Sequence, residues 1–294
     1  MTRIFVVDMN VLQSSQLAGL LSTDVEAQFV LPDTAFVEMS KHEEWELTMS
    51  RALAVFAGHT SRLSISLSTG EILRNELSSL VSSDSSALLS AELKAFAADL
   101  IEEFAHGRKE NARLLVESKF DEVRQKLIAE ELNAVRAKQQ THESLVKWKA
   151  TLKAEVVSAI RKPNADHTFF LSFVQLNAQI FCEDFLESEG VKAADAVAFI
   201  EKKPMILRYF YALTRHILLA LKNGGDISSM KAEKELNNQL DLDYVLIATY
   251  FNGLHTSDKD AQAAYRDITE ILATPMQVAH QRVNQGLRDL GLLA

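Results

Sequence analysis

The chain has 294 residues, of which 47% are hydrophobic and 24% charged, as expected for one large or two ordinary globular domains with a buried core. Its net charge of −9 argues against a general nucleic-acid-binding protein, and no apolar stretch approaches the roughly 20 residues of a membrane helix. The single cysteine, Cys182, excludes an internal disulfide and fits a reducing compartment. We therefore expect a cytoplasmic protein without a signal peptide or membrane association, with Cys182 in its core.

Residues 1–80 are expected to alternate strands and helices. Apolar runs and period-two alternation predict strands over residues 3–8, 28–32 and 61–68. Helices are predicted over residues 11–21 and from about Thr34, with Asp33 or Thr34 as N-cap. Alternation of this kind implies parallel strands with right-handed crossovers.

The middle of the chain is expected to be helical. A polar linker at residues 82–86 precedes a helix capped by Asp84 or Ser85. From Arg108 to Lys162 there is neither Gly nor Pro, and apolar residues recur every three or four positions. This spacing predicts one or two long amphipathic helices, the second arrangement being an antiparallel pair that turns near residues 139–142. Further helical segments are predicted over residues 168–186, 191–200 and 205–221.

Beyond Gly224 and Gly225 the pattern indicates a return to α/β structure. Residues 240–248 are predicted to form a buried helix that opens on acidic residues, and residues 253–258 a turn and a brief strand ending in Asp. Helices interrupted at Pro275 complete the chain. We therefore expect an α/β core with a short parallel sheet, formed by residues 1–80 and 235–294 and interrupted by an all-helical insertion over residues 81–234.

Four acidic residues are expected at or near the carboxyl edge of this sheet: Asp8, Glu38, Asp241 and Asp258. This edge is where open α/β sheets bind ligands. Converging carboxylates without partners either take up protons or recruit hard cations, and oxygen-only ligands favour Mg²⁺ or Mn²⁺. Two such ions can activate a water molecule and neutralise the leaving oxygen in phosphodiester cleavage.

Each acid also has a purely structural interpretation. Asp8 could cap the first helix, and Glu38 could be a surface acid beside Lys41 that pairs with His42. Asp258, with the nearby Asp260, could simply begin the helix that follows.

Asp241 and Asp243 compete for the third acidic position. Asp241 is preferred because it lies nearer the expected start of its helix. Asp243 could equally be an exposed acid in the first turn.

The segments around these acids resemble the motifs of the PIN-domain nucleases. Residues 8–12, where Asn10 follows Asp8 by two positions, resemble the first motif, and residues 31–39, which include Glu38, resemble the second. Residues 241–244 resemble the third, and residues 256–260, where Thr256 precedes Asp258 by two, resemble the fourth. The resemblance covers roughly residues 1–80 and 235–274, and the long helical insertion is not part of a minimal PIN domain.

The resemblance implies a PIN-like three-layer core and a divalent-metal-dependent nuclease. It implies that Asp8, Glu38, Asp241 and Asp258 hold one or two Mg²⁺ or Mn²⁺ ions, with Asp260 as a fifth contributor. Asn10, Thr256 and Asp243 would orient these carboxylates by hydrogen bonds. Members of this family usually cut single-stranded or structured RNA, so RNA is expected over DNA, and many are toxins paired with an antitoxin.

The basic residues of the chain concentrate in residues 105–165, where Lys and Arg outnumber Asp and Glu. We expect the phosphate backbone to contact Arg108, Lys109, Arg113, Arg124 and Lys126, although a solvated mixed-charge helix face would have the same composition. Two other functions remain open, namely a non-catalytic scaffold that binds a protein partner through the insertion and an all-helical regulatory protein. An antitoxin and a homo-oligomer are also left open.

Overall fold

The computed structural model describes residues 3–40, 44–126, 133–161, 166–224, 227 and 230–293, with the backbone alone described over residues 119–126. The chain forms two compact units. The first comprises Met1–Arg74, Ser83–Asn133 and Asn238–Tyr265, and the second comprises Asn75–Ser82, Ala134–Asn237 and Arg266–Ala294. Residues 83–133, expected in the insertion, thus belong to the first unit, and residues 266–294, expected in the core, belong to the second.

The first unit contains a five-stranded sheet with the order β4-β3-β2-β1-β5. Its strands are β1 (Ile4–Val7), β2 (Gln28–Leu31), β3 (Leu63–Ser66), β4 (Leu89–Ser90) and β5 (Gly253–His255). The four predicted strands are all present and run parallel, whereas β4 was not predicted and pairs antiparallel with β3. The fold is therefore α/β, and the prediction of an all-helical protein is wrong.

The central strand β1 fixes which residues meet at the carboxyl edge of the sheet. In the parallel register Phe5 lies opposite Phe29 of β2 and Gly253 of β5, and Val7 lies opposite His255. Gly253 lies against the Phe5 ring, where an added Cβ would make an ordinary van der Waals contact at 3.4 Å. Because β1 and β5 end side by side, the residues after them come together despite their distance in sequence.

The helices of the first unit follow the predicted order with shifted boundaries. The expected helix over residues 11–21 is divided into α1 (Met9–Leu12) and α2 (Ser15–Thr23), because the Ser14 side chain accepts a hydrogen bond from the Gln16 amide and caps α2. Ser90 caps α6 (Ala91–Ala105), whereas Asp84 closes an earlier turn by accepting from the amides of Ser86 and Ala87. The predicted caps at residues 84 and 85 are therefore wrong. The remaining helices are α3 (Asp33–Ser40), α4 (Trp45–Leu53), the 3₁₀ turns η1 (Ala54–Phe56) and η2 (Thr60–Arg62), and α7 (Lys109–Lys126).

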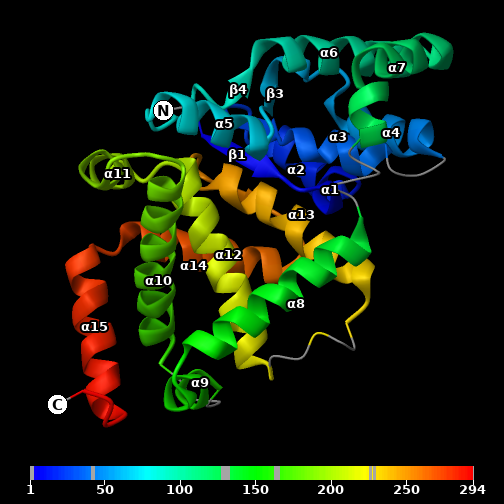
Figure 1. Ribbon diagram of the computed structural model, residues 1–294. Coiled ribbons are helices and arrows are strands. Elements are labelled where there is room, and N and C mark those ends of the chain that lie inside the picture. The colour runs from blue at the N-terminus through cyan, green and yellow to red at the C-terminus, as the bar shows by residue number, and fades with distance from the viewer. Residues whose placement is uncertain are drawn as a thin grey trace. The chain divides into compact units, whose positions relative to one another are not determined.

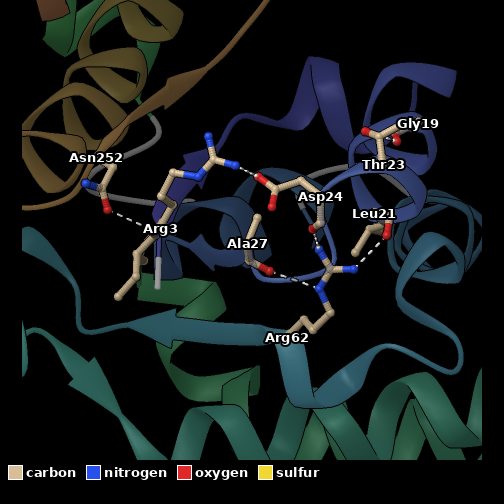
Figure 2. Close-up of polar contacts among 9 residues, drawn as sticks. Arg3, Gly19, Leu21, Thr23, Asp24, Ala27, Arg62 and Asn252 are labelled. Atoms are coloured by element: carbon tan, nitrogen blue, oxygen red, sulfur yellow. Dashed lines mark hydrogen bonds and ion pairs between the residues drawn. The ribbon is translucent and has the colours of Figure 1, made fainter. Parts of the chain in front are cut away.

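A buried arginine stabilises the connection between α2 and β2 through hydrogen bonds. Figure 2 shows the Arg62 guanidinium donating to three backbone carbonyls, those of Leu21, Asp24 and Ala27, at 2.7, 2.5 and 2.9 Å. The same guanidinium lies 5.5 Å from the centre of the Phe29 ring. Carbonyls at a helix end have no partner within the helix, and Arg62 supplies one. The sequence pattern gave no indication of this role.

The second unit is helical and includes α8 (Ala134–Thr151), α9 (Ala154–Arg161), α10 (His167–Ser188), α11 (Ala193–Ile200), α12 (Met205–Lys222) and α15 (Met276–Asp289). Helix α10 packs against α11, α12 and α15, and both α8 and α9 pack against α12 (Figure 1). The predicted turn near residues 139–142 is wrong, since α8 continues through it without a break. Among the described residues, no helix is long and apolar enough to cross a bilayer.

Three helices contribute residues to both units: α5 (Thr69–Ser79), α13 (Ala232–Ala248) and α14 (Lys259–Ala273). Within the second unit, Asp267 of α14 accepts hydrogen bonds from Arg215 at 2.6 Å and lies 2.9 Å from His167 Nε2. Cys182 is fully buried, as predicted, and burial raises the pKa of its thiol to about 12. A thiol in such surroundings is inert as a nucleophile.

Candidate functional site

Asp8 follows β1 and points its carboxylate at two polar side chains. The residue is only 3% exposed, and Oδ2 accepts hydrogen bonds from Asn10 Nδ2 at 3.0 Å and from Thr256 Oγ1 at 2.5 Å. Asp8 occupies the N-cap position of α1, yet its side chain makes no capping hydrogen bond. The helix-cap interpretation therefore does not account for this carboxylate.

Thr256 connects two of the acidic residues through one hydroxyl group. Its Oγ1 donates to Asp8 and accepts the backbone N–H of Asp258 at 3.0 Å. The side chain is 5% exposed, so water does not compete strongly for either bond. Thr256 thereby ties the end of β1 to the loop that follows β5.

Asp258 is not the last residue of a strand, because β5 ends at His255. Its Oδ1 accepts hydrogen bonds from the amides of Asp260 and Ala261 at 2.7 and 2.8 Å, which makes it the N-cap of α14. Asp260 lies exposed in the first turn of that helix. The interpretation that these acids simply begin a helix therefore holds for Oδ1 of Asp258, which caps α14. The charges of Asp258 and Asp260 nevertheless act on Asp241.

Asp241 is the residue whose pKa is influenced by the charges of four other acids. Burial is the largest cause that raises its pKa to about 7, and the charges of Asp8, Asp258, Glu38 and Asp260 raise it further, in that order. The carboxyl groups of these four residues are thus within electrostatic reach of Asp241. The expectation that Asp241 begins its helix is wrong, because α13 starts at Ala232 and Asp241 lies in its second half.

Asp243 has different surroundings from Asp241, because two positions on a helix are about 200° apart around the axis. Its Oδ2 accepts a hydrogen bond of 2.7 Å from Thr34 Oγ1. Its charge, together with that of Glu71, adds to burial in raising the pKa of Asp33 to about 6. Of the two competing acids, Asp241 is the one that shares surroundings with Asp8.

Glu38 lies half-buried on α3 and accepts a hydrogen bond of 2.5 Å from the hydroxyl of Tyr244. Tyr244 is 1% exposed, and burial and the Glu38 charge raise the pKa of its hydroxyl well above the ordinary value. The hydroxyl therefore stays protonated and acts as a donor. Tyr244 was not among the predicted site residues, although it follows Asp241 by three positions on the same helix. Lys41 and His42, the alternative neighbours of Glu38, lie outside the described residues.

The predicted nucleic-acid contacts on α7 are partly engaged with acids. Arg108 donates to both carboxylate oxygens of Glu103 at 2.6 and 2.8 Å, and Arg113 donates to Glu117 at 2.7 Å. Lys109 is exposed at the first position of α7. The side chains of Arg124 and Lys126 lie outside the described part of the chain.

The chemistry of the acidic site is that of hard oxygen donors. Carboxylates in half-buried positions repel one another, and a divalent cation would relieve this repulsion. Asp241 and its four acidic neighbours would be suitable donors for Mg²⁺ or Mn²⁺ by type and charge. In the part of the chain that the structure describes, however, no three Asp, Glu, His or Cys side chains are already arranged to hold a metal ion.

Comparisons of the chain with protein-family models, curated proteins and solved structures gave no match.

Proposed function

We propose that the acidic site binds Mg²⁺ or Mn²⁺ and that the protein is a metal-dependent nuclease, with RNA preferred over DNA. The observation that supports this most directly is the pKa of Asp241, raised to about 7 by burial and by four other carboxylates. A strongly perturbed acid beside a parallel-sheet edge is typical of a functional site. The resemblance of residues 8–12, 31–39, 241–244 and 256–260 to PIN-domain motifs adds to this support and assigns a PIN-like core to the chain.

In this proposal Asp8, Glu38, Asp241 and Asp258 hold the ion, and Asp260 adds negative charge at the rim. The bound metal would supply activation of a water molecule and neutralisation of the leaving oxygen. Thr256 and Asn10 fix the direction of the Asp8 carboxylate, and the Tyr244 hydroxyl does the same for Glu38. We also propose a cytoplasmic location, with which a chain of one cysteine is compatible.

The substitution Asp8→Asn tests the proposal. An asparagine carbonyl can still accept from Asn10 and Thr256, so the fold is retained while one negative charge is removed. With a labelled single-stranded RNA and millimolar Mn²⁺, we expect cleavage by the wild type and only background cleavage by Asp8→Asn.

The matched control is Asp99→Asn, which removes a charge from an exposed position on α6 in the same unit. This variant should cleave as the wild type does, and circular dichroism should show that both variants are folded. Undiminished Mn²⁺-dependent cleavage by folded Asp8→Asn would contradict the proposal.

A second function is favoured by one observation. Among the described residues no metal-binding group is already formed, as would be expected of a non-catalytic scaffold whose helical segment binds a protein partner. The two functions differ in their response to metal. If the protein is a nuclease, binding of millimolar Mn²⁺ at the acidic site should raise its melting temperature, and Asp8→Asn should reduce this rise. A scaffold should show neither effect.

A further inference from the structure

The segment that contains helices α8 and α9 of the second unit carries an excess of positive charge. Over residues 134–161 there are two acids, Glu143 and Glu155, and six basic residues: Arg136, Lys138, Lys147, Lys149, Lys153 and Arg161. This excess stands within a chain whose net charge is −9. A local field of positive sign on an acidic protein concentrates polyanions at one place on the surface.

The positive charge lies on the faces of α8 and α9 that point away from the core. Helix α8 buries Ala137, Thr141, Leu145 and Trp148, which recur at helical spacing on its packed side. Lys147, Lys149 and Lys153 are exposed. Packing against α12 therefore covers one side of each helix, and the three lysines lie outside this packed side.

The two helices enclose a shallow open hollow between their basic residues. It is lined by Lys149, Leu152, Ala154, Val157, Ser158 and Arg161. The hollow thus combines two cations and one hydroxyl group with apolar side chains. Such a lining can bind both the phosphates and the sugars of a nucleic-acid strand. A polyanion that lies in such a hollow contacts both helices at once.

Arg161 reaches this hollow as an immobilised cation. Its Nε and Nη2 donate to the carbonyls of Leu221 and Gly224, each at 2.9 Å. These acceptors are neutral, so the hydrogen bonds orient the guanidinium, and no carboxylate among the described residues forms a salt bridge with it. Arg108, just before α7, and Arg113 on α7 differ, because their partners are the carboxylates of Glu103 and Glu117. Charge compensation of this kind lowers the attraction of α7 for phosphate.

We propose that the hollow between α8 and α9 binds the phosphodiester backbone of a single-stranded nucleic acid without regard to sequence. The α8–α9 hollow of the second unit, and not α7 of the first unit, is then the principal phosphate contact of the protein. This inference concerns binding alone. It rests on the proposed function, because it gives the proposed nuclease a surface that binds the same class of substrate.

Binding of a fluorescent 20-nucleotide uridine RNA tests the inference, measured by anisotropy with full-length protein in EDTA so that no metal-dependent cleavage occurs. The double substitution Lys149→Glu/Lys153→Glu reverses one charge that lines the hollow and a second in the connection between α8 and α9. We expect about tenfold weaker binding or more at 0.1 M salt, and a slope of log K against log salt that is smaller by about 0.7 for each lysine. The matched control, Arg108→Glu/Lys109→Glu at the N-terminal end of α7, should change the affinity much less.

Several outcomes would overturn the inference. An unchanged RNA affinity of the α8–α9 variant would do so, as would an equal loss in both double variants, which would indicate a general field. Retained RNA binding combined with lost binding to phosphatidylserine vesicles would assign the hollow to a membrane surface instead.

Failure of the inference can be told apart from failure of the proposed function. Asp8→Asn should bind the RNA in EDTA as the wild type does, since it lies in the other unit. If Asp8→Asn still cleaves while the α8–α9 variant has lost affinity, the assignment of cleavage to the acidic site fails and the binding surface stands. If cleavage requires Asp8 but the α8–α9 variant binds RNA normally, the proposed function stands and the binding surface fails.

Discussion

The hydroxyl of Thr256 donates a hydrogen bond of 2.5 Å to the Asp8 carboxylate, although 248 positions separate the two residues in sequence. The parallel pairing of β1 with β5 makes this contact possible, because Val7 and His255 lie opposite each other at the ends of the two strands. One buried hydroxyl thus joins the first strand of the chain to a segment near its end.

Replacing Thr256 by valine should destabilise the first unit by about 1–2 kcal/mol. The change keeps the shape but leaves the buried Asp8 carboxylate and the Asp258 amide each without one partner. Urea denaturation in EDTA measures the loss. Thr23→Val is the control, because Thr23 is exposed at the end of α2 and its bond to the Gly19 carbonyl competes with water. Equal stability of the two variants would show that the Thr256 hydroxyl has no structural role.

Replacing Arg62 by methionine should cost about 3 kcal/mol, because three backbone carbonyls lose a charged donor in a buried position (Figure 2). Arg62→Lys should restore little of this, since a lysine ammonium cannot reproduce the planar fork of a guanidinium. Arg51→Met, at an exposed position on α4, should change the free energy of unfolding by less than about 0.5 kcal/mol. A rescue by lysine to wild-type stability would contradict the role assigned to the fork.

Alanine at Gly286 should destabilise the second unit by about 1–3 kcal/mol. An added Cβ would lie 2.2 Å from Cδ2 and 2.5 Å from Cε2 of Phe169, so α15 could no longer pack as closely against α10. Gly19→Ala on α2 is a matched change, since nothing lies within 4 Å of the new Cβ. That variant should gain about 0.5–1 kcal/mol from helix propensity. Thermal denaturation should therefore give shifts of opposite sign for the two substitutions.

Asp33 should make the stability of the protein depend on pH. Burial, with the charges of Glu71 and Asp243, raises its pKa from 3.8 to about 6, and its buried Oδ1 has no hydrogen-bond partner among the described residues. Because the folded pKa exceeds the unfolded one, the contribution of this group to stability is highest below about pH 4 and falls as pH rises through 6.

The substitution Asp33→Asn should remove that dependence. Relative to the wild type it should be up to about 3 kcal/mol more stable at pH 7 and of similar stability near pH 4, as measured by urea denaturation in EDTA. Asp99→Asn should show no such difference between the two pH values. A constant difference between Asp33→Asn and the wild type at both pH values would exclude the titration of Asp33 as its cause.

Local patterns of apolar and polar residues predicted whether a segment is a helix or a strand, but they did not predict the residues at which it begins and ends. The strands at residues 4–7, 28–31, 63–66 and 253–255 were predicted because each is a run of apolar or alternating residues. The two-residue strand β4 is too short to produce such a pattern, and it exists only because Ser90 and Leu89 pair with β3. The start of α13 was missed because residues 232–239 are mostly polar, and polarity alone does not distinguish a helix surface from a loop.

The sequence predicted the acidic members of the candidate site and the two hydrogen-bonding partners of Asp8, Asn10 and Thr256, whereas it missed Tyr244, the partner of Glu38. Asp8, Glu38 and Asp258 were chosen because acids beside strand ends are conspicuous in sequence. Tyr244 lies in a segment whose apolar pattern predicts a buried helix. Its hydrogen bond to Glu38 therefore could not be inferred from spacing. Asp241 was chosen over Asp243 on the wrong ground, since neither lies at the helix start.

The sequence by itself determined that this chain has an α/β part with acids after its strands and a long helical part in which residues 105–165 carry excess positive charge. These properties depend on residues near one another in the chain, whose spacing decides which face is apolar. Only the tertiary structure decided that Asp241 shares its surroundings with Asp8 and Asp258, and that Thr256 bonds Asp8. The parallel register of β1 and β5 brings these residues together, and a register between strands so far apart leaves no local pattern in the sequence.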